Sequence, residues 1–192
     1  MPPNVDMIQP WRQLSSRPCG DYRVFSVREE RKVSPRTGRE HRIFIIDSAD
    51  WVNVVALTPE LRMVLIEQYR HGSNTVELEI PGGVMDPADL SPEAAGCREL
   101  AEETGFQGEE PLIVGQVFPN PAIMSNRCHT VLVRNCRPAG PVQFDPGEDL
   151  VTRLVPLEQV AELVASGRIR HALMVAALYQ FDLWRKFHVW PA

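Results

Sequence analysis

The pattern of apolar and polar residues predicts a series of short strands followed by two helices. Apolar runs typical of strands occur in eight stretches: 21–30, 40–50, 51–57, 62–68, 76–80, 112–118, 129–135 and 151–155. Two C-terminal helices are predicted over 156–166 and 170–187, and the second is apolar enough to be largely buried. Residues 1–20 carry four prolines and no period, so we expect a loose arm there.

A further helix is predicted between Ser91 and Gly105, because both of its ends carry capping residues. Ser91 is a natural N-cap, Pro92 suits the first helical position, and Gly105 suits the left-handed position after the last turn. Three carboxylates follow one another at positions i, i+3 and i+4 and therefore share one face of this helix: Glu99, Glu102 and Glu103.

This acidic face needs a positive partner. Arg98 lies one turn before Glu102 and can pair with it, but one guanidinium cannot neutralise three carboxylates. Mg²⁺ prefers oxygen ligands and uses few carboxylates, so a divalent metal would suit the face, with Mn²⁺ as the alternative ion. A backbone carbonyl in the preceding glycine turn, that of Gly82, is a further candidate ligand. The alternative is an ordinary solvated acidic helix.

Gly83 and the run from Arg98 to Phe106 resemble the Nudix box, Gly-x5-Glu-x7-Arg-Glu-U-x-Glu-Glu-x-Gly-U, in which U is apolar. The second half matches at every specified position. The first half departs, because one extra residue separates Gly83 from Arg98 and Leu90 stands where the pattern has glutamate. Asp89 or Asp86 is a candidate to replace that glutamate.

The resemblance implies an α/β fold, a Nudix-type α/β/α sandwich with a mixed sheet, and the predicted order of elements agrees with it. We expect an N-terminal arm and β segment over 1–48 and the Nudix domain over 49–192. Similar proteins of the ADP-ribose group exchange an N-terminal β segment between the subunits of a dimer. Residues 20–50 resemble that segment, so a homodimer is expected.

Further residues resemble the ADP-ribose and nucleotide-sugar pyrophosphatases. These are Gln68-Tyr69-Arg70, the run Leu78-Glu79-Ile80-Pro81-Gly82-Gly83, and Pro121, fifteen residues after Phe106. The resemblance implies metal-dependent hydrolysis of the pyrophosphate bond of ADP-ribose or a nucleoside diphosphate sugar, giving a nucleoside monophosphate and a sugar phosphate. It assigns substrate binding to Arg70, Glu79 and Pro121.

The resemblance also implies the catalytic roles. Glu99, Glu102 and Glu103 would bind the metal, and Arg98 would orient Glu102. Glu148, in the sequence Glu148-Asp149-Leu150, would be the general base or an additional metal ligand, with Glu102 as the alternative base. His71 and His129 stand in no ligand pattern, and we expect His129 to be structural.

Two other functions stay open at this point. One is a non-catalytic, nucleotide-sensing Nudix domain, which the complete Arg-Glu-x-x-Glu-Glu sequence opposes. The other is a hydrolase that removes unwanted nucleoside triphosphates, which the N-terminal segment and Pro121 oppose. Turnover of a panel of nucleotides would separate all three functions.

Composition argues against two classes of partner. The net charge of −5 provides no broad basic surface for nucleic acid, and the absence of eighteen consecutive apolar residues predicts no transmembrane helix. The N-terminus lacks the charged start and apolar core of a secretory signal, so we expect a cytoplasmic protein. The four cysteines have no zinc-binding spacing and are expected to be free, buried thiols.

Overall fold

The computed structural model describes residues 8–144, 147 and 149–188. The chain divides between Ser48 and Ala49 into two compact units. The N-terminal unit also includes Asn120–Asn126, and the second unit is formed by Ala49–Pro119 and the chain from Arg127 onward. None of the described helices is long and apolar enough to span a membrane.

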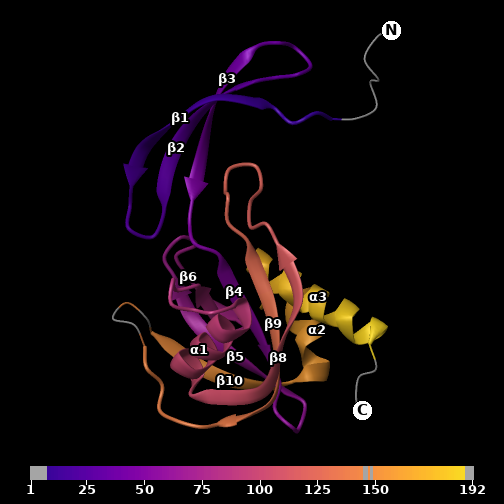
Figure 1. Ribbon diagram of the computed structural model, residues 1–192. Coiled ribbons are helices and arrows are strands. Elements are labelled where there is room, and N and C mark those ends of the chain that lie inside the picture. The colour runs from indigo at the N-terminus through magenta and orange to yellow at the C-terminus, as the bar shows by residue number, and fades with distance from the viewer. Residues whose placement is uncertain (1–7, 145–146, 148, 189–192) are drawn as a thin grey trace. The chain divides into compact units, whose positions relative to one another are not determined.

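The N-terminal unit is a three-stranded antiparallel sheet in the order β1-β2-β3 (Figure 1). Its strands are β1 (Arg12–Asp21), β2 (Ser26–Val33) and β3 (Glu40–Asp47). The expected loose arm is therefore wrong from Arg12 onward. β1 is exposed along almost its whole length, so neither of its faces needs apolar residues and its sequence shows no apolar alternation. The strand also has two register irregularities against β2, one of them at Pro18.

The second unit contains two sheets. A mixed four-stranded sheet has the order β7-β4-β9-β8, in which β4 and β9 are parallel and the outer pairs are antiparallel. A three-stranded antiparallel sheet has the order β10-β5-β6. The strands are β4 (Trp51–Ala56), β5 (Arg62–Arg70), β6 (Thr75–Glu79), β7 (Gly82–Val84), β8 (Phe106–Val117), β9 (Cys128–Pro138) and β10 (Leu150–Pro156).

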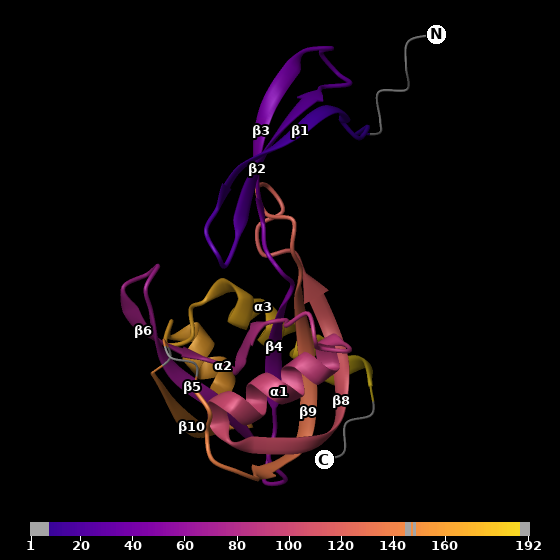
Figure 2. The ribbon, with the colours of Figure 1, turned by 60° about the vertical axis from the view of Figure 1, so that its left-hand side comes forward.

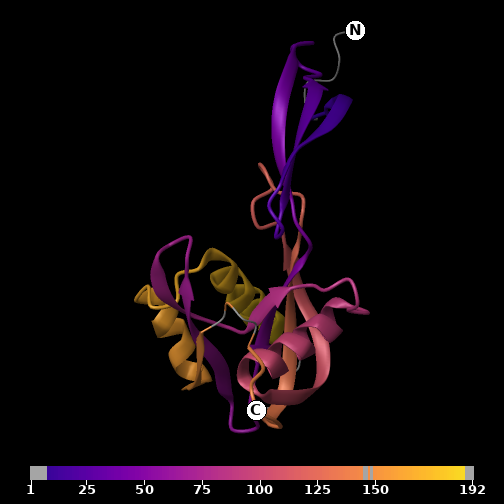
Figure 3. The same ribbon diagram turned by 90° about the vertical axis from the view of Figure 1, so that its left-hand side faces the viewer.

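Helices cover both faces of the mixed sheet. Along β4, Val54 and Ala56 pack in a core cluster with Leu100 of α1 (Pro92–Thr104), whereas Val55 packs in a second cluster with Phe181 of α3 (Ala172–Phe187). The second cluster also contains Val160 of α2 (Leu157–Ala165). Figures 2 and 3 show α1 on one side of the strands and α2 and α3 on the other. The predicted α/β/α sandwich with a mixed sheet is confirmed.

Two local predictions were wrong. The residues expected to form a glycine turn, Gly82 and Gly83, belong to strand β7, which pairs with β4. A side chain at Gly82 would lie 2.2 Å from the carbonyl oxygen of Val52, so this close strand pairing requires glycine. Strand β8 begins at Phe106 rather than at residue 112, and three register irregularities against β9 break the alternation of its early residues.

The four cysteines are free thiols. Cys128 and Cys136 are buried and Cys97 is half-buried, but Cys19 is exposed on β1, so the expectation of buried thiols is wrong for Cys19. Burial raises the pKa of Cys128 and of Cys136 to about 12, so neither is a ready nucleophile.

Candidate active site

The ends of helix α1 have the predicted caps. Ser91 Oγ accepts a hydrogen bond from the Ala94 amide at 3.2 Å, and Gly105 adopts a left-handed conformation with φ of 71°. The Gly105 amide donates to the carbonyl of Ala101. These caps define both ends of the helix and so determine which residues face strand β7.

Two of the three predicted carboxylates are buried against β7. Glu103 is 2% exposed, and its Oε2 accepts the Gly82 amide hydrogen at 2.9 Å. Glu99 lies so close to Gly83 that a methyl group at Gly83 would come within 2.5 Å of Glu99 Oε1. Gly82 contacts Glu103 through its amide and not through its carbonyl, which was the predicted metal ligand. The acidic face of α1 is thus turned toward the glycine pair.

Arg98 connects the rest of this face. Its Nη1 donates to Glu102 Oε2 at 2.8 Å, as predicted, and its Nη2 lies 3.0 Å from Glu99 Oε1. Its Nε and Nη2 bind the two carboxylate oxygens of Asp89 at 3.1 and 3.0 Å. The hydrogen bond from Arg98 holds the pKa of Asp89 below its usual range, and the same bond raises the pKa of Arg98. One guanidinium therefore positions two of the three box carboxylates.

The contacts of Arg98 also account for the altered first half of the box. Of the two candidate replacements, Asp89 pairs with Arg98, whereas Asp86 supports the loop by donating its amide hydrogen to Asp89 Oδ2 at 2.8 Å. Leu90, at the position of the pattern's glutamate, is 96% exposed. The longer loop thus moves the acidic partner of Arg98 back by one residue.

The donor set fits a hard divalent cation. Glu99, Glu102 and Glu103 offer only carboxylate oxygens, and the space beside Glu99 exists because Gly83 has no side chain. Among residues 8–144, 147 and 149–188, no group of three acidic, histidine or cysteine side chains is gathered closely enough to hold a metal as the side chains stand. Arg98 and the Gly82 amide engage the carboxylates instead.

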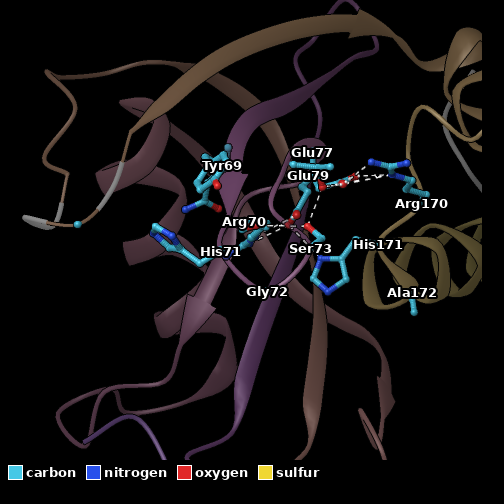
Figure 4. A pocket seen from close by; sticks show the side chains of 13 residues that line it. Tyr69, Arg70, His71, Gly72, Ser73, Glu77, Glu79, Arg170, His171 and Ala172 are labelled. Carbon is cyan, nitrogen blue, oxygen red and sulfur yellow. Dashed lines mark hydrogen bonds and ion pairs between the residues drawn. The ribbon is translucent and has the colours of Figure 1, made fainter.

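A cavity of about 920 Å³ opens in the same unit (Figure 4). Its wall comes from the β5–β6 hairpin, from the connection between α2 and α3, and from Gly147. The lining residues are Gln68, Tyr69, Arg70, His71, Gly72, Ser73, Thr75, Glu77, Glu79, Gly147, Arg170, His171 and Ala172. Only Ile80 and Pro81 separate Glu79 of this wall from Gly82, which binds Glu103. The cavity and the acidic face of α1 are therefore joined by one short segment.

The structure brings together Arg70 and Glu79, both predicted to bind substrate. Arg70 donates from Nε and Nη2 to the two oxygens of Glu79, at 3.0 and 2.8 Å. Glu79 is fully buried, whereas the Arg70 side chain is 38% exposed in the cavity. Burial raises the pKa of Glu79, but the neighbouring His171 and Arg70 outweigh this effect, so the pKa lies below its usual value. Glu79 therefore anchors Arg70.

Two cavity residues were missed from the sequence. Arg170 binds Glu77 from Nε and Nη2, and His171 Nδ1 lies 3.1 Å from Glu79 Oε2. A signal was available, because Glu77 and Glu79 alternate along a predicted strand and share one face, which requires a cationic partner when that face is buried. Arg170 and His171 are the first two residues of the helix predicted over 170–187, whereas the observed α3 begins only at Ala172.

Three further residues were considered from the sequence: Pro121, Glu148 and His129. Pro121 is exposed and belongs to the N-terminal unit, and it is not among the described residues that line the cavity. Glu148, the predicted general base, lies outside the described residues. His129 is buried, with Nε2 3.3 Å from Asp50 Oδ2.

Comparisons with known proteins agree with this geometry. The NUDIX domain model matches residues 47–178. The chain is 31% identical over 176 residues to mouse ADP-sugar pyrophosphatase, covering 86% of this chain and 75% of that protein. It is 24% identical to the ADP-ribose pyrophosphatase of Mycobacterium tuberculosis, covering 86% of this chain and 80% of that protein.

Solved structures give the same fold. The crystal structure of an ADP compounds hydrolase matches with a TM-score of 0.82 and 23% identity, over 94% of this chain and 96% of that one. At 23% identity this match shows that the two chains share a fold. With the family model and the mouse relative, the acidic face of α1, its arginine and the glycine pair of β7 identify the chain as a member of the Nudix family.

Proposed function

We propose that this Nudix pyrophosphohydrolase cleaves the pyrophosphate bond of ADP-ribose or another nucleoside diphosphate sugar, giving a nucleoside monophosphate and a sugar phosphate. One observation carries the proposal. The segment from Glu79 to Gly82 joins the cavity that Arg70 lines to the acidic face of α1. The mouse relative is an ADP-sugar pyrophosphatase and the mycobacterial relative is an ADP-ribose pyrophosphatase, which supports the choice of substrate.

The divalent metal that such a reaction needs would be Mg²⁺, with Mn²⁺ as the alternative, and Glu99, Glu102 and Glu103 would hold it, with Gly82 as a backbone ligand. When bound, the ion would neutralise charge on the pyrophosphate and activate a water. These ligand assignments follow from the carboxylate donor set and from the family pattern.

The protein's own groups have separate tasks. Arg98 orients Glu99 and Glu102, since its guanidinium contacts both carboxylates. Arg70 presents a planar guanidinium at the cavity, a geometry suited to phosphate oxygens. Glu79 holds that guanidinium in place, and Pro121 is proposed as a further substrate contact.

A carboxylate near the attacking water must accept its proton, and we assign this role to Glu148, with Glu102 as the alternative. Gly147, the residue before Glu148, lines the cavity. Glu102 is the less suitable of the two because its Oε2 already accepts a hydrogen bond from Arg98.

We also propose that the protein is a cytoplasmic homodimer that associates through residues 20–50. Strands β1 and β3 are the two edges of the N-terminal sheet within that unit. The unit also exposes large apolar side chains, including Tyr22, Val24 and Phe44. Unpaired strand edges and exposed apolar residues favour association with a second chain.

Steady-state turnover of ADP-ribose, GDP-mannose, UDP-glucose and dGTP, with and without Mg²⁺, tests the proposed function. We expect metal-dependent hydrolysis of ADP-ribose or one of the two nucleotide sugars, with little hydrolysis of dGTP. Hydrolysis of dGTP alone would make the protein a triphosphate hydrolase. Binding without turnover of any of the four would make it a nucleotide sensor.

A further inference from the structure

Two neighbouring residues of the α2–α3 connection contact two acidic residues of β6. Arg170 binds Glu77, and His171 contacts Glu79 (Figure 4). Because Glu77 and Glu79 are two positions apart on a strand, their side chains leave the same face. The last residues before α3 are thereby held against the β5–β6 hairpin on one wall of the cavity.

The two contacts are not equivalent. Arg170 is 58% exposed and is bound to Glu77, whose other hydrogen-bond partner is Thr75. His171 contacts Glu79, whose two oxygens are already occupied by the forked guanidinium of Arg70. Glu79 Oε2 is therefore shared between His171 Nδ1 and Arg70 Nη2, at 3.1 and 2.8 Å. His171 is thus linked to Arg70 through one buried carboxylate.

We propose that His171 is a positioning residue for substrate binding, which acts through Glu79 to hold the Arg70 guanidinium toward the phosphate groups of a nucleoside diphosphate. This inference rests on the proposed function, because it assumes that Arg70 contacts the substrate. His171 belongs neither to the box nor to Gln68-Tyr69-Arg70, and its contact with Glu79 appears only in the folded chain, where the α2–α3 connection meets β6.

The physical reason lies in how a glutamate is oriented. The terminal torsion of a glutamate side chain is broad, so packing alone leaves the plane of the carboxylate free to turn. A bidentate arginine follows that plane because its fork is rigid. The His171 ring is a second contact on this carboxylate, with Nδ1 3.1 Å from Oε2, and it restricts how far the carboxylate plane can turn. His171 therefore fixes the carboxylate plane, and with it the direction in which Arg70 points.

Burial makes the effect strong. Glu79 is fully buried, so water does not replace a missing partner on Oε2. His171 is 35% exposed and lines the same cavity, so it contacts the carboxylate from the side on which substrate would enter. Removing the imidazole would leave Arg70 paired with Glu79 but with a wider range of orientations.

The test compares three substitutions of His171 in the full-length chain. His171→Asn keeps an N–H near the position of Nδ1, His171→Gln moves the amide further out, and His171→Ala removes the donor. We expect His171→Ala and His171→Gln to raise KM for the best substrate of the panel about tenfold, with kcat and the half-saturating Mg²⁺ concentration nearly unchanged. His171→Asn should retain most of the affinity. His188→Ala, at the end of α3, is the matched control.

A double-mutant cycle with Arg70 separates positioning from a general structural effect. If His171 acts through Arg70, His171→Ala should raise KM much less in an Arg70→Lys background than in the wild-type protein. Independent, multiplying effects on KM would overturn the proposal. An unchanged KM in His171→Ala would also overturn the proposal, as would an equal increase in KM in the His171→Asn and His171→Gln variants. If His171→Ala does not fold, the Asn and Gln pair still decides the question.

A measurement of stability keeps this inference distinct from the proposed function. If the wild-type protein hydrolyses none of the four nucleotides, the proposed function fails. The link between His171 and Glu79 is then tested by thermal unfolding of His171→Ala, Glu79→Gln and the double variant. We expect the Tm losses to be less than additive, and full additivity would overturn the link.

Discussion

Glu103 of helix α1 and Gly82 of strand β7, 21 residues apart in the chain, are joined by a hydrogen bond of 2.9 Å from the Gly82 amide to Glu103 Oε2. The bond ties the most buried carboxylate of the acidic face to the backbone beside the cavity wall. The bond fixes the position of one carboxylate oxygen of Glu103 relative to strand β7.

Glu103→Gln should leave the protein folded and reduce turnover by several orders of magnitude, because a neutral amide is a poor ligand for a hard cation. Circular dichroism and steady-state kinetics at saturating Mg²⁺ provide the measurement. Glu93→Gln, in the first turn of the same helix, is the matched control and should keep nearly full activity. Near-normal kcat in Glu103→Gln would remove Glu103 from the metal site.

Gly83→Ala should reduce activity about 10²-fold through misplacement of a ligand. The added methyl group would meet Glu99 Oε1 at 2.5 Å, so the carboxylate must move. We expect the half-saturating Mg²⁺ concentration to rise in the same variant. Gly140→Ala is the control, since a side chain there meets open space. Equal activity of the two variants would contradict the placement of Glu99.

The pair Glu77–Arg170 should contribute to stability in a defined range of pH. Hydrogen bonds from Arg170 and then Thr75 lower the pKa of Glu77 from 4.5 to about 2. Since the folded-state pKa is depressed, the contribution is fully present above about 4.5 and is lost as the pH falls toward 2. Glu77→Gln should therefore be less stable than the wild type at pH 7, and the difference should shrink below pH 4.5.

Urea unfolding at several pH values measures that difference. The exposed residue Glu158 gives a control, because Glu158→Gln should change stability little at any pH. A Glu77→Gln difference that stays constant across the range would show that the Arg170 contact does not depend on the charge of Glu77.

Glu148→Gln distinguishes a base from a metal ligand. If Glu148 is the base, kcat should fall about 10²–10⁴-fold while the half-saturating Mg²⁺ concentration hardly changes. If it is a ligand, more Mg²⁺ should be needed and excess metal should partly restore the rate. When neither quantity moves, Glu102 becomes the first candidate for the base.

The protein should be a stable homodimer in solution, organised through residues 20–50. Light scattering at micromolar concentration checks the mass of the species against the monomer mass of 21.7 kDa. Phe44→Glu, on an exposed position of β3, should weaken association because it places a charge among exposed apolar side chains. A monomer at these concentrations in the wild-type protein would exclude the proposal.

Local chemistry in the sequence was enough to predict the acidic helix. Ser91 and Gly105 define its ends through backbone bonds to neighbouring turns, and the three carboxylates share a face because of helical spacing alone. The pairing of Arg98 with Glu102 was predicted for the same reason, since residues four apart on a helix are neighbours. Such features depend on contacts within a few residues.

The remaining features depended on contacts between distant parts of the chain. Asp89, rather than Asp86, meets Arg98 because of the course of an irregular loop, which no periodicity describes. Strand β1 was missed because its pairing with β2 rests on backbone bonds while its side chains stay exposed. His171 meets Glu79, 92 positions earlier in the chain, because the connection before α3 lies against β6. The apolar residues of α3 share a core cluster with Leu78 of β6, but many sequences can bury an apolar helix face, so that pattern does not predict which polar residues meet.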